Sequence, residues 1–367
     1  MPTLQDQSIA VVLGTRPEII KLGHVIRLLG PAARVIHTGQ HFDDDLSKIF
    51  FGAFGLVAPP VTIGVGGATR GTQIGRSVAE LDARFAAERP VAVVVQGDTN
   101  SAVAGAIAAN ANDIPLVHVE SGLRSHDRRM PEEHNRVIAD HLADLCCAPT
   151  ETNRANLHAE AISDDRIVVT GNTIVEALRA LLPDPAARTA LLTKHDLTPA
   201  GFVLGTFHRP ENVDDPAVLE TILEQLASLP VPVVLPLHPR TRIRISTHAK
   251  LAALAARLTV LEPLGYAEFL GLAAESAMLI SDSGGVQEEA SLLKRPVVVV
   301  RRSTERPEVL GTFAELIPPG PQISKQARAW LGDVAALHDR LATIASPYGD
   351  GTASQRTVDG IGALVDA

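Results

Sequence analysis

Short runs of aliphatic and β-branched residues recur along the chain, and each is followed by glycine, serine or charged residues and then by a segment with helical spacing. The runs are continuous rather than alternating, which is typical of strands that helices cover on both faces. Strands that alternate with helices favour right-handed βαβ units and parallel sheets. The strands predicted in this way are residues 9–13, 91–95, 116–119, 167–170, 203–206, 231–236, 258–261, 278–281 and 297–300.

The pattern pauses after residue 171 and through the proline-bearing segment 181–185, and it restarts at residue 201. A length of 367 residues is about twice that of a typical single domain. We therefore expect an α/β protein of two doubly wound, Rossmann-like domains, covering residues 1–173 and 174–352. Ligands of such folds bind at the carboxyl ends of the strands, so an interdomain cleft is expected there.

Polar and charged turns follow most of the predicted strands. Each turn alone is consistent with an ordinary helix cap or turn. Together they place charges along one rim, where carboxylates beside arginine and histidine can take acid/base roles. The turns are GTRPE (14–18), QGDT (96–99), ESGLR (120–124), HRPEN (208–212) and HPR (238–240).

The stretch DSGGVQEEA (282–290) leaves a predicted strand through two glycines and enters a helix. It is either a tight strand-to-helix turn or a phosphate seat, because glycines bring backbone N–H groups close to an anion at the positive end of a helix. The stretch RRSTERPE (301–308) is likewise either a solvated loop or a loop that places the Arg306 guanidinium on a phosphate.

A helix is predicted over residues 130–145, opened by Pro131, with Ile138, Leu142 and Leu145 as its core stripe. Glu132 and Arg136 lie one turn apart on another flank. They form either a surface ion pair contributing about 0.2 to 0.5 kcal/mol, or a carboxylate held by Arg136 at the mouth of the cleft.

Composition excludes several classes of protein. A net charge of −9 argues against a nucleic-acid partner, which needs clustered Lys and Arg. Two adjacent cysteines supply neither a disulfide framework nor a four-cysteine metal site, and no apolar run approaches the roughly 20 residues of a membrane span. P-loop, zinc, dinucleotide and nucleophile-elbow motifs are absent. We expect a cytoplasmic enzyme that binds a nucleotide diphosphate ligand, without membrane, metal or cofactor.

Twelve motifs in order resemble the non-hydrolysing UDP-N-acetylglucosamine 2-epimerases, a family of GT-B-type architecture. They span nearly the full chain: GTRPEIIK (14–21), GQHFD (39–43), QGDTNS (96–101), HVESGLRS (118–125), MPEEHNR (130–136), APTETNRANL (148–157), TGNTIVEAL (170–178), HRPEN (208–212), HPRT (238–241), DSGGVQEEA (282–290), TERPE (304–308) and PYGDG (348–352). Ser121 departs from the usual alanine. The resemblance implies a tail helix, 353–367, that returns to the first domain, and a homodimer.

The family reaction inverts C2 of the sugar while it stays in UDP-linked form. The resemblance implies anti elimination of UDP to 2-acetamidoglucal, followed by re-addition with the proton delivered to the other face. Two requirements follow: acid/base groups must serve both faces of C2, and the departing diphosphate must be stabilised and retained.

The resemblance also implies the site residues. The acid/base set in the first domain, completed by a histidine of the second, matches Asp98, Glu120, Glu132, Arg136 and His208. The UDP set matches Arg16, Lys21, His238, Ser283, Gly284, Gly285, Glu289 and Arg306, with the glycines around the diphosphate and Glu289 at the ribose diol. Glu288 is interpreted as a helix-start carboxylate.

Three other functions remain open at this point. A hydrolysing epimerase would release the free amino sugar, although in that branch the stretch after the third strand resembles His-Gly-Gly-Glu rather than HVESGLRS. A GT-B glycosyltransferase would bind UDP in the same way but does not require the three acids. A non-enzymatic sugar-nucleotide sensor would keep binding without turnover.

Overall fold

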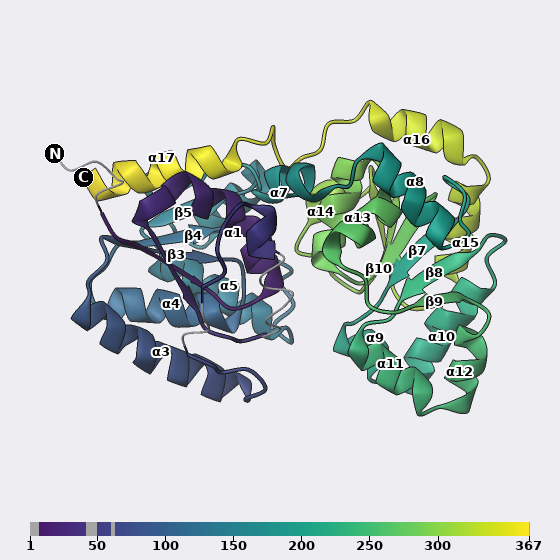
Figure 1. Ribbon diagram of the computed structural model, residues 1–367, viewed down its shortest axis with the longest axis horizontal. Coiled ribbons are helices and arrows are strands. Elements are labelled where there is room, and N and C mark those ends of the chain that lie inside the picture. Colours follow the sequence, from purple (N-terminus) through teal and green to yellow (C-terminus); the bar gives the residue numbers. More distant parts are fainter. Residues whose placement is uncertain (1–6, 42–49, 60–62, 367) are drawn as a thin grey trace. The chain divides into compact units, whose positions relative to one another are not determined.

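The computed structural model describes residues 7–41, 50–59 and 63–366. The chain divides into two compact units, residues 1–180 with 348–367, and residues 181–347 (Figure 1). The division falls between Ala180 and Leu181, near the end of α7 (Ile174–Leu181), whereas the sequence placed the boundary at the start of that helix.

The first unit contains one six-stranded sheet in the order β2-β1-β3-β4-β5-β6, and every pair in it is parallel. Helices α3 and α4 lie on one side of this sheet, and α1 and α17 lie on the opposite side (Figure 1). The strands are β1 (Ile9–Leu13), β2 (Ala33–His37), β3 (Ala92–Gln96), β4 (Leu116–Val119), β5 (Leu145–Ala148) and β6 (Ile167–Val169). The helices are α1 (Arg16–Leu29), α3 (Arg70–Ala87), α4 (Asn100–Ala111), α5 (Pro131–Leu142), α6 (Glu151–Ala159), α7 and α17 (Ala353–Asp366).

The second unit has its own parallel sheet, in the order β12-β11-β10-β7-β8-β9, and its own hydrophobic core. The strands are β7 (Val203–Thr206), β8 (Val233–Pro236), β9 (Thr259–Leu261), β10 (Met278–Ser281), β11 (Val297–Val300) and β12 (Ala314–Ile317). The helices are α8 (Pro185–Lys194), α9 (Pro210–Val213), α10 (Pro216–Ala227), α11 (Pro239–Ser246), α12 (Ala249–Ala255), α13 (Tyr266–Glu275), α14 (Gly284–Leu293), α15 (Gln322–Leu331) and α16 (Val334–Ala342). Among the described residues, short 3₁₀ turns lie at Gly30–Ala32, Asp164–Arg166 and Pro307–Val309.

All nine predicted strands are present, with ends shifted by at most two residues, and three further strands, β2, β5 and β12, were not predicted. The helix predicted to run to residue 145 ends at Leu142, and Leu145 instead begins β5. Its expected core stripe is also wrong, because Ile138 is 39% exposed. The buried face of α5 carries polar residues instead, among them Arg136 and Asp140.

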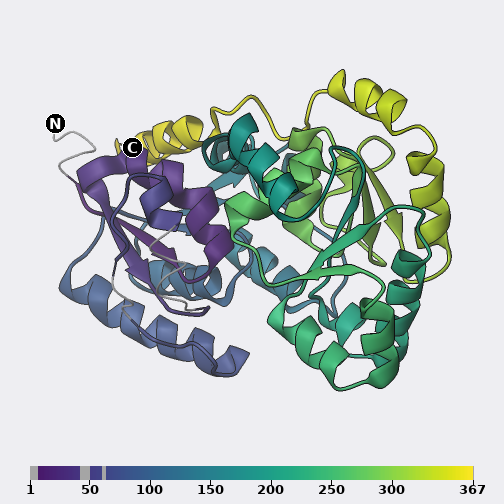
Figure 2. The ribbon, with the colours of Figure 1, turned by 45° about the vertical axis from the view of Figure 1, so that its right-hand side comes forward.

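The end of the chain folds onto the first unit. α17 packs against α1 and β5, and Figures 1 and 2 both show it alongside α1. The backbone N–H of Asn172 donates to the carbonyl of Tyr348 at 2.9 Å, and the backbone N–H of Ser354 donates to the Glu176 carboxylate at 2.7 Å. Ile361 is completely buried. The tail is therefore an integral part of the first unit's core.

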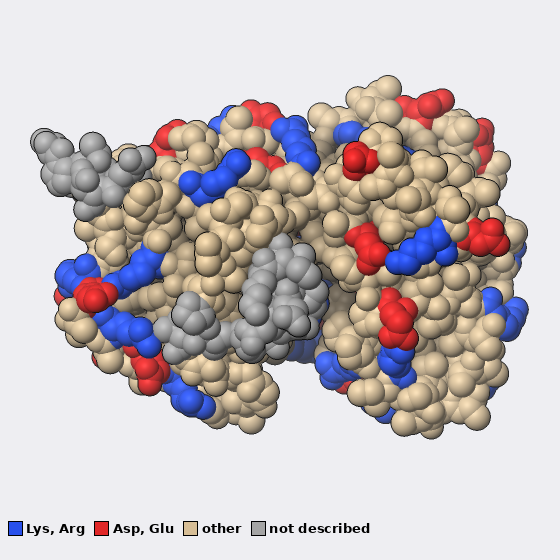
Figure 3. Space-filling view, in the orientation of Figure 1, with Lys and Arg blue, Asp and Glu red and all other residues tan. Residues whose placement is uncertain are grey.

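The surface carries both signs of charge. On the face shown in Figure 3, Lys and Arg side chains lie among Asp and Glu side chains over both units. Within the described residues, no helix is both long enough and apolar enough to cross a bilayer.

Candidate functional site

Strand order identifies one crevice in each sheet. In a doubly wound sheet, ligands bind at the carboxyl ends of the strands where the order reverses. In the first unit this point lies between β1 and β3, so the turns that begin at Gly14 and Gly97 lie side by side. In the second unit it lies between β7 and β10, next to His208 and Asp282. The nominated turns after β1, β3, β7 and β10 therefore flank the two crevices, and those after β4 and β8 lie one strand away.

In the first unit, Lys21 of α1 and Glu120 after β4 form a buried ion pair; the two side chains are 7% and 8% exposed. The side-chain amide of Asn172 also donates to the Glu120 carboxylate at 3.3 Å. Glu120 has a backbone φ of +65°, a conformation that costs a non-glycine residue energy and is often found at functional sites. The turn therefore holds a carboxylate in a fixed position beside a cation.

A second ionic group joins α5 to the turn after β3. Arg136 donates to the Asp98 carboxylate from Nε at 3.0 Å and from Nη2 at 2.6 Å, and it also pairs with Glu133. Glu133 accepts the backbone N–H groups of Ser125 and His126 as well. The sequence nominated Asp98 and Arg136 but placed Glu132 at the arginine; Glu132 is half-buried at the start of α5, and the sequence analysis missed Glu133. Glu133 is buried because α5 turns a polar face inward, whereas the sequence analysis expected an apolar face there.

Glu18 is a further residue that the sequence analysis did not nominate as a site residue. Its side chain is fully buried and accepts the N–H groups of Gly14 at 2.9 Å and Thr15 at 2.8 Å, with the Thr99 hydroxyl donating at 2.8 Å. Burial raises the pKa of Glu18 to about 7, although these hydrogen bonds lower it. Glu18 thus joins the two turns that flank the first crevice. The Glu at the fourth position of a capped helix start, Thr15-x-x-Glu18, is the signal that could have identified it.

In the second unit, Asp282 organises the crevice between β7 and β10. It is fully buried and accepts the backbone N–H groups of His208 and Arg209, both at 3.1 Å, and the Asn212 amide at 3.1 Å. Burial alone would raise the pKa of Asp282, but the hydrogen bond from His208 and the other donors hold it below its ordinary value. The His208 ring lies 5.8 Å from that of the exposed His238. These two nominated histidines are therefore neighbours.

The glycine turn after β10 is a strand-to-helix turn, as predicted. β10 ends at Ser281, and α14 begins at Gly284 with Ser283 as its N-cap. A Cβ atom at Gly284 would lie 2.5 Å from Nη1 of Arg306, so only glycine fits there without displacing the arginine. The backbone N–H groups of a helix start attract anions, so the geometry suits a phosphate.

Two carboxylates of α14 take different partners. Glu289 accepts the Tyr266 hydroxyl at 2.7 Å, and burial together with Glu289 raises the pKa of Tyr266 well above its ordinary value. Glu288 accepts Nε of Arg306 at 2.6 Å, and Arg306 also pairs with Glu305. Glu288 is completely buried, so its interpretation as a helix-start carboxylate is wrong.

The remaining nominated residues lie at element starts. Arg16 is exposed at the first position of α1, and Gly285 is half-buried in the first turn of α14. Phe42 and Asp43 of the GQHFD motif lie outside the described residues. No group of three or more His, Cys, Asp or Glu side chains in the described part of the chain is arranged to hold a metal ion.

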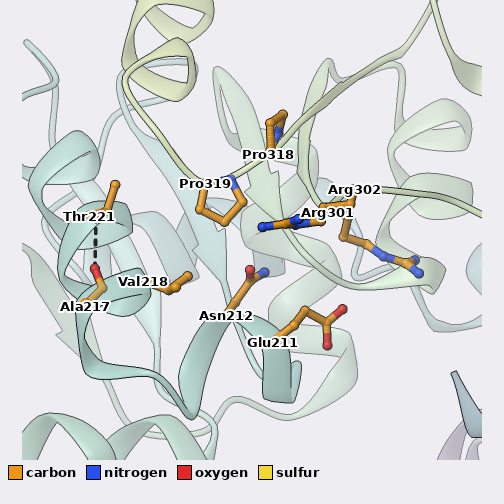
Figure 4. Close-up of a pocket in the computed structure, with 9 residues that line it drawn as sticks. All are labelled: Glu211, Asn212, Ala217, Val218, Thr221, Arg301, Arg302, Pro318 and Pro319. Atoms are coloured by element: carbon orange, nitrogen blue, oxygen red, sulfur yellow. Dashed lines mark hydrogen bonds between the residues drawn. The ribbon is translucent and has the colours of Figure 1, made fainter. Parts of the chain in front are cut away.

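A pocket of about 290 Å³ lies at the carboxyl ends of β11 and β12 (Figure 4). Its lining residues come from α9, α10 and the two strand ends: Glu211, Asn212, Ala217, Val218, Thr221, Arg301, Arg302, Pro318 and Pro319. It shares Asn212 with the hydrogen bonds around Asp282. None of its lining residues is among the individually predicted site residues, although Glu211, Asn212, Arg301 and Arg302 lie in the stretches HRPEN (208–212) and RRSTERPE (301–308).

Comparisons with known proteins identify the family to which the chain is similar. The profile of a family described as UDP-N-acetylglucosamine 2-epimerase matches residues 31–362. A UDP-N-acetylglucosamine 2-epimerase from Methanocaldococcus jannaschii is 37% identical over 361 residues, covering 95% of this chain and 97% of that protein. A UDP-2,3-diacetamido-2,3-dideoxy-D-glucuronate 2-epimerase from Pseudomonas aeruginosa is 35% identical over 362 residues, covering 96% and 98%.

Solved structures show the same fold. A crystal structure of the Methanocaldococcus jannaschii UDP-GlcNAc 2-epimerase in complex with UDP-GlcNAc and UDP has a TM-score of 0.83 and 35% identity, over 96% of this chain and 99% of that chain. That of the Neisseria meningitidis UDP-GlcNAc 2-epimerase bound to UDP-GlcNAc has a TM-score of 0.86 and 30% identity, over 96% and 99%. The predicted α/β fold of GT-B type with two parallel sheets is confirmed, and each sheet has six strands.

Proposed function

Because the chain belongs to the UDP-N-acetylglucosamine 2-epimerase family, and is therefore an isomerase, we propose that it interconverts UDP-N-acetylglucosamine and UDP-N-acetylmannosamine without releasing the free amino sugar. The observation that carries the proposal is the pair of ionic groups at the first crevice, Lys21 with Glu120 and Arg136 with Asp98 and Glu133. They hold carboxylates in place beside cations at strand ends, where an acid and a base are needed.

The chemical difficulty is the proton at C2, which is not adjacent to a carbonyl group. Elimination of UDP avoids direct abstraction to a carbanion: a base removes the C2 proton while the C1–O bond to the diphosphate breaks, giving 2-acetamidoglucal and UDP. Re-addition then forms the C1–O bond again, and an acid delivers a proton to the opposite face of C2. The first unit supplies the acids and bases for this sequence from Asp98, Glu120 and Glu132, with Arg136 holding Asp98.

The second unit binds the leaving group in this proposal. Ser283, Gly284 and Gly285 offer a glycine-rich helix start to the diphosphate, and Arg306 adds a guanidinium next to Gly284. Glu289, which Tyr266 holds by a hydrogen bond, accepts the ribose hydroxyls. His208 and His238 lie together near the crevice, and Arg16 and Lys21 contribute positive charge from α1. Binding UDP tightly retains the intermediate and stabilises the departing charge.

A proton NMR time course in heavy water tests the proposal. With UDP-N-acetylglucosamine and no acceptor, we expect deuterium at C2 and UDP-N-acetylmannosamine as the product. Accumulation of free N-acetylmannosamine with UDP would favour the hydrolysing reaction instead. Absence of C2 exchange would contradict epimerisation and favour a glycosyltransferase or a sensor. Glu132→Gln should abolish exchange while UDP binding, measured by calorimetry, is retained.

The substrate is tested in the same assay. The relative from Pseudomonas aeruginosa acts, by its name, on a UDP-linked diacetamido sugar acid at nearly the same identity to this chain. We therefore include UDP-2,3-diacetamido-2,3-dideoxy-D-glucuronate, and we expect a larger kcat/KM for UDP-N-acetylglucosamine. A larger kcat/KM for the sugar acid would replace the proposed substrate and leave the 2-epimerase reaction in place.

A further inference from the structure

A group of three buried charged or titratable side chains lies behind the first crevice. His118 of β4 and Asp140 of α5 are completely buried, and Arg124 is 4% exposed. Nδ1 of His118 lies 2.6 Å from Oδ1 of Asp140, and Nη1 of Arg124 lies 2.7 Å from Oδ2 of Asp140. The proposed reaction uses none of the three, so their burial has no explanation in the chemistry described above.

The protonation state of His118 follows from its partners. Nε2 lies 2.8 Å from the carbonyl oxygen of Gly97, which only accepts, so Nε2 carries a proton. Asp140 also accepts from Arg124 and from the Gly122 backbone N–H at 3.1 Å. Burial would raise the pKa of Asp140, but His118 and Arg124 hold it below its ordinary value. Asp140 is therefore ionised, and Nδ1 of His118 must donate to it.

The surrounding charges balance this assignment. Arg124 also forms a two-point contact with Glu160, at 2.7 and 2.6 Å, so two cations face two carboxylates. The Arg166 side chain donates only to backbone carbonyls, including that of Asp140. Cys146 of β5 is next to His118 in register, and burial raises the pKa of its thiol, so it remains neutral. An imidazolium at His118 is thus matched by Asp140, and Arg124 by Glu160, while the half-buried Arg166 is held by backbone carbonyls.

The His118–Asp140 pair contacts both turns that carry acid/base residues. Through Nε2, His118 holds the Gly97 carbonyl, which belongs to the peptide bond leading into Asp98. Through Asp140, it also holds the N–H of Gly122. Gly122 lies two residues after Glu120 in the same turn, and Glu120 has a φ of +65°. His118 therefore bridges the two turns, in addition to the backbone hydrogen bond from the Gly97 N–H group to the Val119 carbonyl at 3.0 Å.

We propose that His118 is a positioning residue, hydrogen-bonded through both ring nitrogens, which through Gly97 and Asp140 sets the relative placement of the Asp98 and Glu120 carboxylates. It would not touch the substrate. The effect on catalysis rests on the proposed function, whereas the protonation state does not.

Protonation is tested directly on the wild-type protein by nitrogen NMR with histidine-selective ¹⁵N labelling. The His118 signals are assigned among those of the 13 histidines from triple-resonance connectivities in the wild-type protein, so the assignment does not depend on a variant. We expect both ring nitrogens to carry protons, because each lies within hydrogen-bond distance of an oxygen acceptor. A ring nitrogen of His118 without a proton would overturn the proposal.

Kinetics test the positioning role with two complementary variants. His118→Asn is chosen to keep an N–H donor toward Asp140 and to lose the one toward Gly97, and His118→Gln is chosen for the reverse. Each should lower kcat between about 10- and 100-fold, because a displacement on the ångström scale misaligns reacting groups. UDP affinity should stay within twofold of wild type, because the proposed UDP residues that carry the diphosphate lie in the other unit. His141→Asn, on the exposed side of α5, is the matched control and should leave kcat unchanged.

The outcomes separate the two proposals. A purely structural His118 would lower the melting temperature of both variants but leave kcat per folded molecule at the wild-type value, and this result would overturn the positioning role. If the wild-type protein shows no epimerisation, the proposed function fails, while the NMR measurement still decides the protonation of His118. If neither variant folds, the wild-type NMR measurement alone confirms or refutes the imidazolium.

Discussion

Glu18 places a carboxylate with no exposed surface between the first turn of α1 and the turn after β3. Burial raises its pKa from 4.5 to about 7, so between these values the folded protein binds more protons than the unfolded chain. The resulting stabilisation is complete below pH 4.5 and is lost as the pH rises through 7.

Glu18→Gln should remove this pH dependence. A glutamine carbonyl still accepts from Gly14 and Thr15, and its NH₂ group donates to the Thr99 hydroxyl, as a protonated Glu18 would. Relative to wild type, the variant's free energy of unfolding should therefore rise by about 3 kcal/mol from pH 4.5 to 8. Urea unfolding at a series of pH values measures it. The exposed Glu80→Gln variant of α3 serves as the control. An identical pH slope in wild type and Glu18→Gln would show that Glu18 is ionised throughout.

Individual site residues could be predicted from the sequence more readily than the side chains with which they form ion pairs. Asp98 and Arg136 lie in recognisable motifs, and the strand before Asp98 predicts which edge of the sheet it occupies. The pairing of Arg136 with Glu133 rather than Glu132 depends on how α5 is rotated, and the helix turns its polar face inward against the usual hydrophobic pattern. The spacing of residues along the helix does not reveal this rotation.

At the scale of elements, strands covered on both faces were predictable because their apolar runs are bounded by polar turns. β5 was missed because its sequence LCCA follows α5 after only Ala143 and Asp144, and apolar residues so close to a helix resemble one more turn. The helix stops there because Asp144 accepts the Leu116 backbone N–H at 2.8 Å, a contact with β4 that is distant in sequence. β12 was missed because prolines follow it directly.

The start of α14 allows a matched pair of substitutions. A Cβ atom at Gly285 would meet nothing closer than Glu289 Oε1 at 3.9 Å, so Gly285→Ala fits the folded protein and should raise its stability by up to about 1 kcal/mol. A Cβ atom at Gly284 would lie 2.6 Å from Glu305 Oε1 and would displace Arg306, so Gly284→Ala should destabilise the protein.

Both alanine variants should weaken UDP binding at least about tenfold if the diphosphate contacts this turn, because a methyl group blocks the close approach of backbone N–H groups to an anion. Calorimetric titration with UDP and thermal melting measure the two effects separately. Gly285→Ala is the decisive variant, because its fold is undisturbed. Wild-type UDP affinity in Gly285→Ala would remove this turn from the diphosphate site.

At the scale of the whole molecule, the chain forms two units, each with a buried core cluster of its own. The last helix belongs to the first unit although it follows the second in sequence, so the first unit is completed only when residues 348–367 return to it. Separate cores predict separate unfolding transitions when each unit is perturbed alone.

Ile361 of α17 and Leu341 of α16 are both completely buried, one in each unit, and truncating either to alanine should cost about 2 to 5 kcal/mol. Ile361→Ala should lower the melting temperature of the first unit and Leu341→Ala that of the second, and scanning calorimetry resolves the two transitions. Adding UDP should raise mainly the transition that Leu341→Ala lowers, because most of the proposed UDP residues lie in the second unit and ligand binding stabilises the unit that binds it. A single transition that both variants shift equally would show that the units unfold together, and a UDP-induced rise confined to the other transition would move the nucleotide site into the first unit.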